Sequence, residues 1–183
     1  VLVFSGPCTP RESNVQVRST IFDAARDGDL EVVFAKASKL VSSRLGGTID
    51  TLLDEEGYTV AMKAVQGDEL ECLKALVLRL NASVGPELRN QYGFTTLHLA
   101  AYHEASSALV DYLLSQAPAL VNAQESGGWT PLVIAASKGN LRIVKALLEK
   151  GRADVNAKTY IDQTALYIAC NNGFVNVVNI LLD

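Results

Sequence analysis

The chain has few of the residues from which metal centres and disulfide frameworks are built. Its 183 residues include only two histidines, His98 and His103, and three cysteines, Cys8, Cys72 and Cys170, none in a CxxC spacing. Two histidines argue against a zinc cluster. Scattered cysteines are more typical of small buried side chains in a reducing compartment than of a disulfide or a metal site. We therefore expect no metal and no cofactor.

Long apolar runs and an excess of basic residues are also missing. No stretch reaches the roughly 18 apolar residues that suggest a membrane-spanning helix, and the net charge of −4 does not fit a nucleic-acid-binding surface. The apolar start, residues 1–6, is short and lacks the basic region of a signal peptide. We expect a cytoplasmic or nuclear protein, a monomer, with no membrane span and no nucleic-acid partner.

What the chain does contain is one pattern repeated along its length. A threonine opens each copy, at Thr59, Thr95, Thr130 and Thr164, with spacings of 36, 35 and 34 residues, and a weaker copy opens at Ser19. Five and six positions after each opener lies a pair of mostly small residues: Ala24-Ala25, Ala64-Val65, Ala100-Ala101, Ala135-Ala136 and Ala169-Cys170. A unit of this length buries its apolar face only by stacking on its neighbours. The pattern predicts a solenoid whose function lies on a surface.

Each copy predicts two short helices followed by an extended stretch. In the fourth copy, Thr130 is suited to cap the first helix and Pro131 to occupy its first position. Gly139 ends this helix; in the second copy the glycine comes one position earlier, at Gly67. The second helix carries apolar residues at helical spacing between positions 141 and 148.

This order of helix, glycine turn, helix and extended loop resembles the ankyrin repeat. The motifs that carry the resemblance are Gly128-Trp129-Thr130-Pro131-Leu132, Ala135-Ala136, Gly139, Ile143-Val144, Leu147-Leu148, Ala153-Asp154-Val155-Asn156-Ala157 and Thr96-Leu97-His98-Leu99-Ala100-Ala101. The resemblance implies an all-α solenoid of about five stacked helix-turn-helix units joined by finger-like β-turn loops. The repeat domain would cover residues 19–183, in units of about 19–54, 55–90, 91–125, 126–159 and 160–183. Residues 1–18 would form an unassigned N-terminal extension, and an extended helix or loop would lie near residues 36–54.

Residues that could suggest an enzyme have simpler explanations. In the ankyrin family, a threonine and a histidine placed like Thr95 and His98 bond locally and brace the turn between units. Acidic pairs such as Asp23 with Asp27, or the neighbours 55 and 56, come with no shaped pocket and no partner base. We read them as solvated surface, and we expect no catalytic residue and no enzymatic activity.

Aromatic residues mark the side on which we expect a partner to bind. In the family, the residue before each opener lies in the projecting turn next to the concave face, outside the core. The candidate partner-binding residues are Tyr58, Tyr92, Phe94, Tyr102, His103, Trp129 and Tyr160. Large rings supply contact area while few rotatable bonds are frozen. The alternative is that these rings pack across neighbouring fingers and stiffen the ridge.

Together these features predict a non-enzymatic module that binds a partner protein or an extended peptide on the concave face. Acidic residues such as Glu55, Glu56 and Glu125 favour a basic partner. The alternative function is a targeting or regulatory arm of a larger enzyme or channel. The last predicted helix, near residues 175–182, carries no polar substitution on its outer side, so we expect more repeats or a capping element after Asp183.

Overall fold

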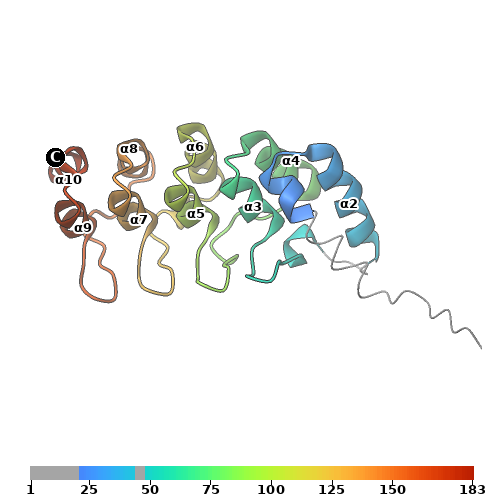
Figure 1. Cartoon of the computed structure of the whole chain (residues 1–183), viewed down its shortest axis with the longest axis horizontal. Helices are drawn as coiled ribbons and strands as arrows, with labels where there is room; N and C mark the ends of the chain where they lie inside the picture. The colour runs from blue at the N-terminus through green and yellow to red at the C-terminus, as the bar shows by residue number, and fades with distance from the viewer. Residues whose placement is uncertain (1–20, 44–47) are drawn as a thin grey trace, which may run out of the picture.

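The computed structural model describes residues 21–43 and 48–183, with the side chains of residues 40–43 left aside. The expectations for the extension 1–18, for Cys8 and for the opener Ser19 lie outside the described residues. The described chain forms a row of helix pairs, with loops projecting from one side of the row (Figure 1). The predicted all-α solenoid is confirmed.

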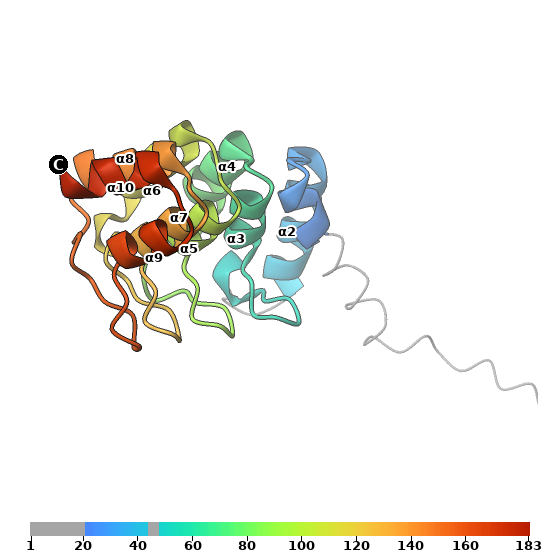
Figure 2. The same cartoon turned by 60° about the vertical axis from the view of Figure 1, so that its left-hand side comes forward.

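Each pair consists of an inner helix, next to the loops, and an outer helix behind it (Figure 2). The inner helices are α3 (Val60–Gln66), α5 (Thr96–Tyr102), α7 (Pro131–Ser137) and α9 (Ala165–Asn171), and the outer helices are α4 (Leu70–Leu80), α6 (Ser107–Gln116), α8 (Leu141–Glu149) and α10 (Val175–Leu182). At the N-terminal end, a helical segment over residues 21–26 precedes the longer α2 (Leu30–Ser43) and the short η1 (Ile49–Thr51). A second short segment, η2 (Pro118–Leu120), follows α6.

The repeated threonine determines where each inner helix begins. The hydroxyl oxygens of Thr59, Thr130 and Thr164 accept a hydrogen bond from the backbone N–H three residues later, at 3.2, 3.4 and 3.2 Å. Thr95 does the same work through a capping box with His98. These bonds satisfy donors that the first turn of a helix leaves without a partner. The periodic opener is therefore a periodic helix cap, as the sequence predicted for Thr130.

Inner helices within the row are buried on nearly all sides because neighbours lie against them in both directions. In α7, residues 132–136 are at most 3% exposed, and α7 contacts α5 on one side and α9 on the other. Ala135 and Ala136 are fully buried, and their small side chains permit close approach of the neighbouring helices. Stacking between units, rather than helix propensity within them, supplies the core of this fold.

The turn between the helices of a pair passes through the left-handed backbone region nine residues after each opener. Gly139 occupies this position with φ 71°, whereas Asp68 and Glu104, each with φ 58°, occupy it in the second and third units. Gly67 is therefore not the turn glycine that the sequence suggested. Its backbone is right-handed, and a Cβ there would lie 1.7 Å from the carbonyl oxygen of Arg26. The close approach of the first unit requires glycine at this place.

Candidate functional site

The loops that project from the inner helices, at residues 54–59, 90–95, 125–130 and 159–164, are narrow turns that we call fingers. In each finger the first residue uses a side-chain oxygen to hold the backbone N–H four positions later: Asp54 with Tyr58 at 2.8 Å, Asn90 with Phe94 at 2.9 Å, Glu125 with Trp129 at 3.0 Å and Thr159 with Gln163 at 3.2 Å. The fourth residue has positive φ, at Gly57, Gly93, Gly128 and Asp162. Both features fix the turn that presents the residue before each opener.

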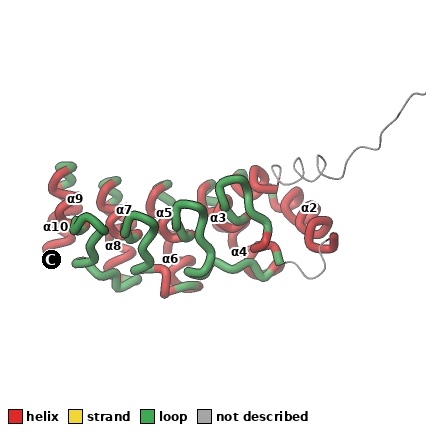
Figure 3. The backbone as a smooth tube through the Cα atoms, turned by 90° about the horizontal axis from the view of Figure 1, so that it is seen from below, coloured by secondary structure: helices red, strands yellow, loops and turns green. Residues whose placement is uncertain are grey.

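Neighbouring fingers are also bonded to one another through their backbones. The N–H groups of Gln91, Ser126 and Tyr160 donate to the carbonyl oxygens of Glu56, Tyr92 and Gly127, at 3.1, 3.2 and 3.1 Å. Seen from the finger side, the loops form a continuous row along the solenoid (Figure 3). The side chains on this row are therefore held at a fixed spacing.

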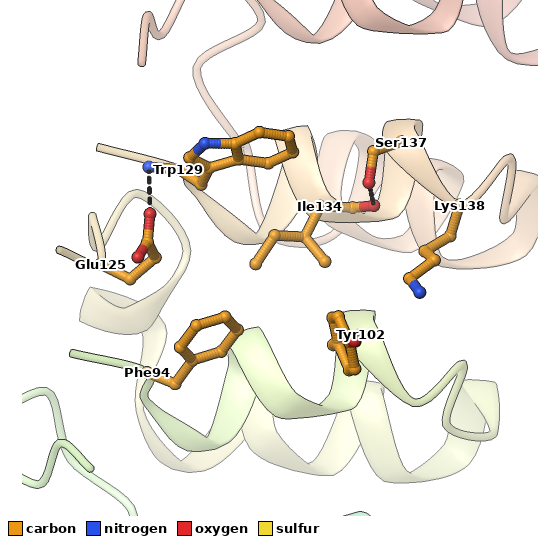
Figure 4. Close-up of a pocket in the computed structure, with 7 residues that line it drawn as sticks. All are labelled: Phe94, Tyr102, Glu125, Trp129, Ile134, Ser137 and Lys138. Carbon is orange, nitrogen blue, oxygen red and sulfur yellow. Dashed lines mark hydrogen bonds between the residues drawn. The ribbon is translucent and has the colours of Figure 1, made fainter. Parts of the chain in front are cut away.

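Two adjoining hollows lie between the fingers and the exposed ends of the inner helices. The larger, of about 400 Å³, is lined by Phe94, Tyr102, Glu125, Trp129, Ile134, Ser137 and Lys138 (Figure 4). The smaller, of about 280 Å³, is lined by Tyr58, Gln66, Tyr92, Phe94, Leu99, Tyr102 and His103. Phe94 and Tyr102 belong to both, so the two hollows share a wall of aromatic side chains.

The hollows gather six of the seven residues that the sequence singled out for partner binding. Tyr160 is the exception, because it lines neither hollow. Its side chain is 69% exposed and lies against Gly128, where a Cβ would come within 2.6 Å of the ring. The binding role of all seven residues stays a prediction; the structure shows how they are arranged.

Tyr58 departs from the expectation that the residue before each opener stays outside the core. It is 8% exposed, and its burial raises the pKa of its hydroxyl group. The ammonium of Lys63 lies 4.3 Å from its ring centroid and pairs with Asp54 at 2.9 Å. Lys63, on the inner helix α3, thus contacts both the ring of Tyr58 and the carboxylate of Asp54, and this packs the first finger against α3. Part of the ring still lines the smaller hollow.

Edge-to-face contacts link the rings in the shared wall. Phe94 lies edge-on to His98 and to Tyr102, with centroid distances of 5.6 and 6.2 Å. Tyr102 also contacts His103, at 5.2 Å, and the ammonium of Lys138 lies 4.1 Å from the Tyr102 centroid. Such contacts hold rings in place before a partner arrives. These ring pairs all lie within the third unit, so the alternative of rings packed across neighbouring fingers stays a prediction.

His98 ties α5 to the next finger from inside the protein. It is fully buried; its Nδ1 accepts from the Thr95 backbone N–H at 3.2 Å, and its Nε2 lies 3.0 Å from the Trp129 carbonyl oxygen. These partners assign the neutral tautomer that carries its proton on Nε2. Desolvation lowers the His98 pKa to about 4, although the Trp129 carbonyl opposes this change. His98 thus bonds locally to Thr95 and also to the next finger, as expected for a histidine that braces the turn between units.

A family model described as ankyrin repeats (three copies) matches residues 21–125 and 105–183. The chain belongs to the ankyrin-repeat family. It is 34% identical over 95 residues to ankyrin repeat domain-containing protein 53 of Mus musculus. That match covers 50% of this chain and 18% of the mouse protein, so the chain spans less than a fifth of that relative. Ankyrin repeats generally mediate protein–protein interaction and are typically not enzymes.

The other polar groups considered in the sequence lie on the surface of this ankyrin-repeat protein. Asp23 and Asp27 are exposed and lie 3.4 and 3.1 Å from Arg26, while Glu55 and Glu56 are exposed at the first finger. Among the described residues, no group of three or more histidine, cysteine, aspartate or glutamate side chains could hold a metal ion. Within the same residues, no helix has the length and apolar character needed to cross a membrane.

Sequence reasoning missed the inner-helix residues that complete the hollows. Gln66 and Ser137 lie seven positions after their openers, where the third unit has Tyr102, and Lys138 lies eight positions after its opener, where the third unit has His103. These residues could have been found from the sequence by comparing equivalent positions in successive repeats. The seventh position lines a hollow in three successive units and the eighth in two of them, and Leu99 and Ile134 line the hollows from the fourth position after their openers.

Proposed function

We propose that this ankyrin-repeat protein binds a partner protein or an extended peptide on the surface formed by the two hollows, between fingers and inner helices. One observation carries the proposal: residues from three consecutive units converge on a continuous concave surface that shares Phe94 and Tyr102. Phe94 and Trp129 are half-buried, packed against the core on one side and open to the hollow on the other. Rings already fixed in this way lose little conformational entropy when a partner covers them.

The fingers support a partner that presents basic residues to them. Glu55 and Glu56 are exposed on the first finger. Glu125 differs, because its Oε1 accepts from the backbone N–H groups of Gly127 and Trp129, at 2.8 and 3.0 Å. Glu125 therefore holds the turn of its finger, and it also lines the larger hollow. Opposite charges at such a rim act mainly on association rate and specificity.

The test is affinity capture with the wild-type chain beside the double variant Phe94→Ala/Trp129→Ala, with the captured proteins identified. A matched control is Leu78→Ala, since Leu78 is 80% exposed on α4, outside both hollows. We expect partners that bind the wild type and the control but are lost from the double variant. Circular dichroism melting of all three proteins checks that the fold survives. Partners captured equally by all three would refute binding at the hollows.

A second candidate function is a targeting or regulatory arm of a larger protein, and the observation that supports it is the apolar side chains exposed on α9 and α10. Three positions after the opener, Met62, His98 and Val133 are at most 1% exposed, whereas Tyr167 is 56% exposed. Val175 and Leu182 are also exposed on α10. Such a face suits packing against another folded part. Detecting the native protein at a mass well above 19.6 kDa would support the arm, and a native mass near that value would argue against it.

A further inference from the structure

The larger hollow has opposite charges at its two ends. Glu125 lies at the finger end, beside the Trp129 backbone, and Lys138 lies at the other end, above Tyr102 and just past the C-terminus of α7 (Figure 4). The rings of Phe94 and Trp129 and the side chain of Ile134 lie between them. A ligand that fills the hollow with an apolar side chain therefore extends toward Lys138 on the side away from the fingers.

Lys138 has no carboxylate partner among the described residues, which sets it apart from the other lysine at this rim. Lys63 is paired with Asp54 at 2.9 Å and is mostly buried. Lys138 is exposed, forms no ion pair within the described chain and has its ammonium over the Tyr102 ring, 4.1 Å from the centroid. The Ser137 hydroxyl, which also lines this hollow, donates to the Ile134 carbonyl at 2.8 Å.

The charge of Lys138 also acts on the adjoining hollow, where it disfavours a second positive charge. His103 lines the adjoining hollow, and desolvation together with the charges of Lys138 and Lys63 lowers its pKa. A partner segment that covers the larger hollow removes water from Lys138. An ammonium that loses water without gaining an acceptor costs free energy, so a ligand fits this end only if it supplies one. A second cation placed there would meet Lys138 as a like charge.

Resting on the proposed function, we propose that the partner segment carries a carboxylate, from Asp or Glu, directly beyond the apolar side chain that fills the hollow, and that this carboxylate pairs with Lys138. The segment would then show a fixed order of chemistry along its length. Basic residues face the acidic fingers, an apolar side chain enters between Phe94 and Trp129, and an acidic residue reaches Lys138. A uniformly basic segment lacks the last of these features.

The experiment selects a phage-displayed library of random peptides, each of about 12 residues, on the wild-type chain and then measures synthetic copies of the enriched peptides. We expect enriched sequences to contain an apolar residue followed by Asp or Glu. Lys138→Glu should weaken their binding by about tenfold or more. A peptide with that acidic residue changed to Lys should regain binding on the Lys138→Glu protein. Lys145→Glu, at an exposed position on α8, controls for the change in net charge.

The outcomes separate this inference from the function on which it rests. Enriched peptides that lose binding to Phe94→Ala/Trp129→Ala, but carry no acidic residue or respond equally to Lys138→Glu and Lys145→Glu, would overturn the role of Lys138 and leave the binding surface standing. Peptides that bind the double variant as tightly as the wild type would overturn both. A selection that enriches no sequence would also count against both.

Discussion

Acidification should destabilise the folded chain at the start of α5, because the ring of His98 is buried in its neutral form and its Nδ1 accepts a hydrogen bond from the Thr95 backbone N–H. Desolvation lowers the His98 pKa from 6.5 to about 4 in the folded protein. Between these values the unfolded chain binds a proton that the folded chain does not, so stability is lost as pH falls from 6.5 toward 4. Integrated over this range, the loss is about 2 kcal/mol at pH 5 and about 3 kcal/mol at pH 4.

The control variant for this prediction is His98→Gln, whose side-chain amide can donate to the Trp129 carbonyl oxygen but does not titrate. Both proteins are unfolded with urea at pH 7.5 and at pH 5, which removes the contribution of all other titrating groups from the comparison. We expect the difference in unfolding free energy between wild type and variant to shift by about 2 kcal/mol against the wild type at pH 5. Proton NMR of the His98 ring should show its neutral form persisting well below pH 6.

A difference between the two proteins that stays constant between pH 7.5 and pH 5 would refute this prediction. That result would mean that the His98 ring takes up a proton as readily in the folded chain as in the unfolded chain. The hydrogen bond that Nδ1 accepts from the Thr95 backbone N–H, at 3.2 Å, would then not hold the ring in its neutral form. Burial of the ring would then not lower its pKa in the folded chain.

Three further changes test the core, the first interface and the fingers. Leu147→Ala should lower the free energy of unfolding in urea by about 2–5 kcal/mol, because Leu147 is fully buried. Leu78→Ala, at an 80% exposed position, should change it by less than about 0.5 kcal/mol. Equal losses in the two variants would contradict the stacking of the units. Gly67→Ala should force the first unit away from α3, so the amides of α2 should lose protection from hydrogen exchange while those of α7 keep theirs. Unchanged protection in α2 would refute the close approach of Arg26 to Gly67. Glu125→Gln should leave the melting temperature nearly unchanged, since an amide oxygen can accept the same two N–H bonds. Glu125→Ala should lower the melting temperature, because it removes that acceptor. Equal effects of the two variants would rule out the role of Glu125 in holding the turn.

The features that could be predicted from the sequence are those that depend on neighbours within about ten residues along the chain. Thr130 and Pro131 specify a helix start by themselves, because a cap is a bond between residues three apart. The small pair Ala135-Ala136 predicts close helix packing wherever it recurs. The candidate rings also came from register alone, since the residue before each opener is fixed by its finger.

Contacts across units could not be predicted in the same way, because they depend on how far each unit rotates and shifts on the next. Phe94 and Tyr58 occupy the same repeat position, yet Phe94 is half-buried while Tyr58 is 8% exposed. The approach of Lys138 to Tyr102 joins residues 36 positions apart, and the Gly67 contact joins it to Arg26 in the unit before. The size of a neighbouring side chain decides such contacts, and no local pattern records it.

The fingers show which charges on this surface the fold itself requires. The same bond to a backbone N–H is made by Asp54, Asn90, Glu125 and Thr159, which carry two carboxylates, an amide and a hydroxyl. The turn therefore needs an oxygen within reach and does not need a negative charge. Lys138 likewise holds no carboxylate in the described chain, although Lys63 at the same rim does. The charges of Glu125 and Lys138 are thus properties of the hollow rather than of the folded backbone, and they are the ones a bound partner would meet.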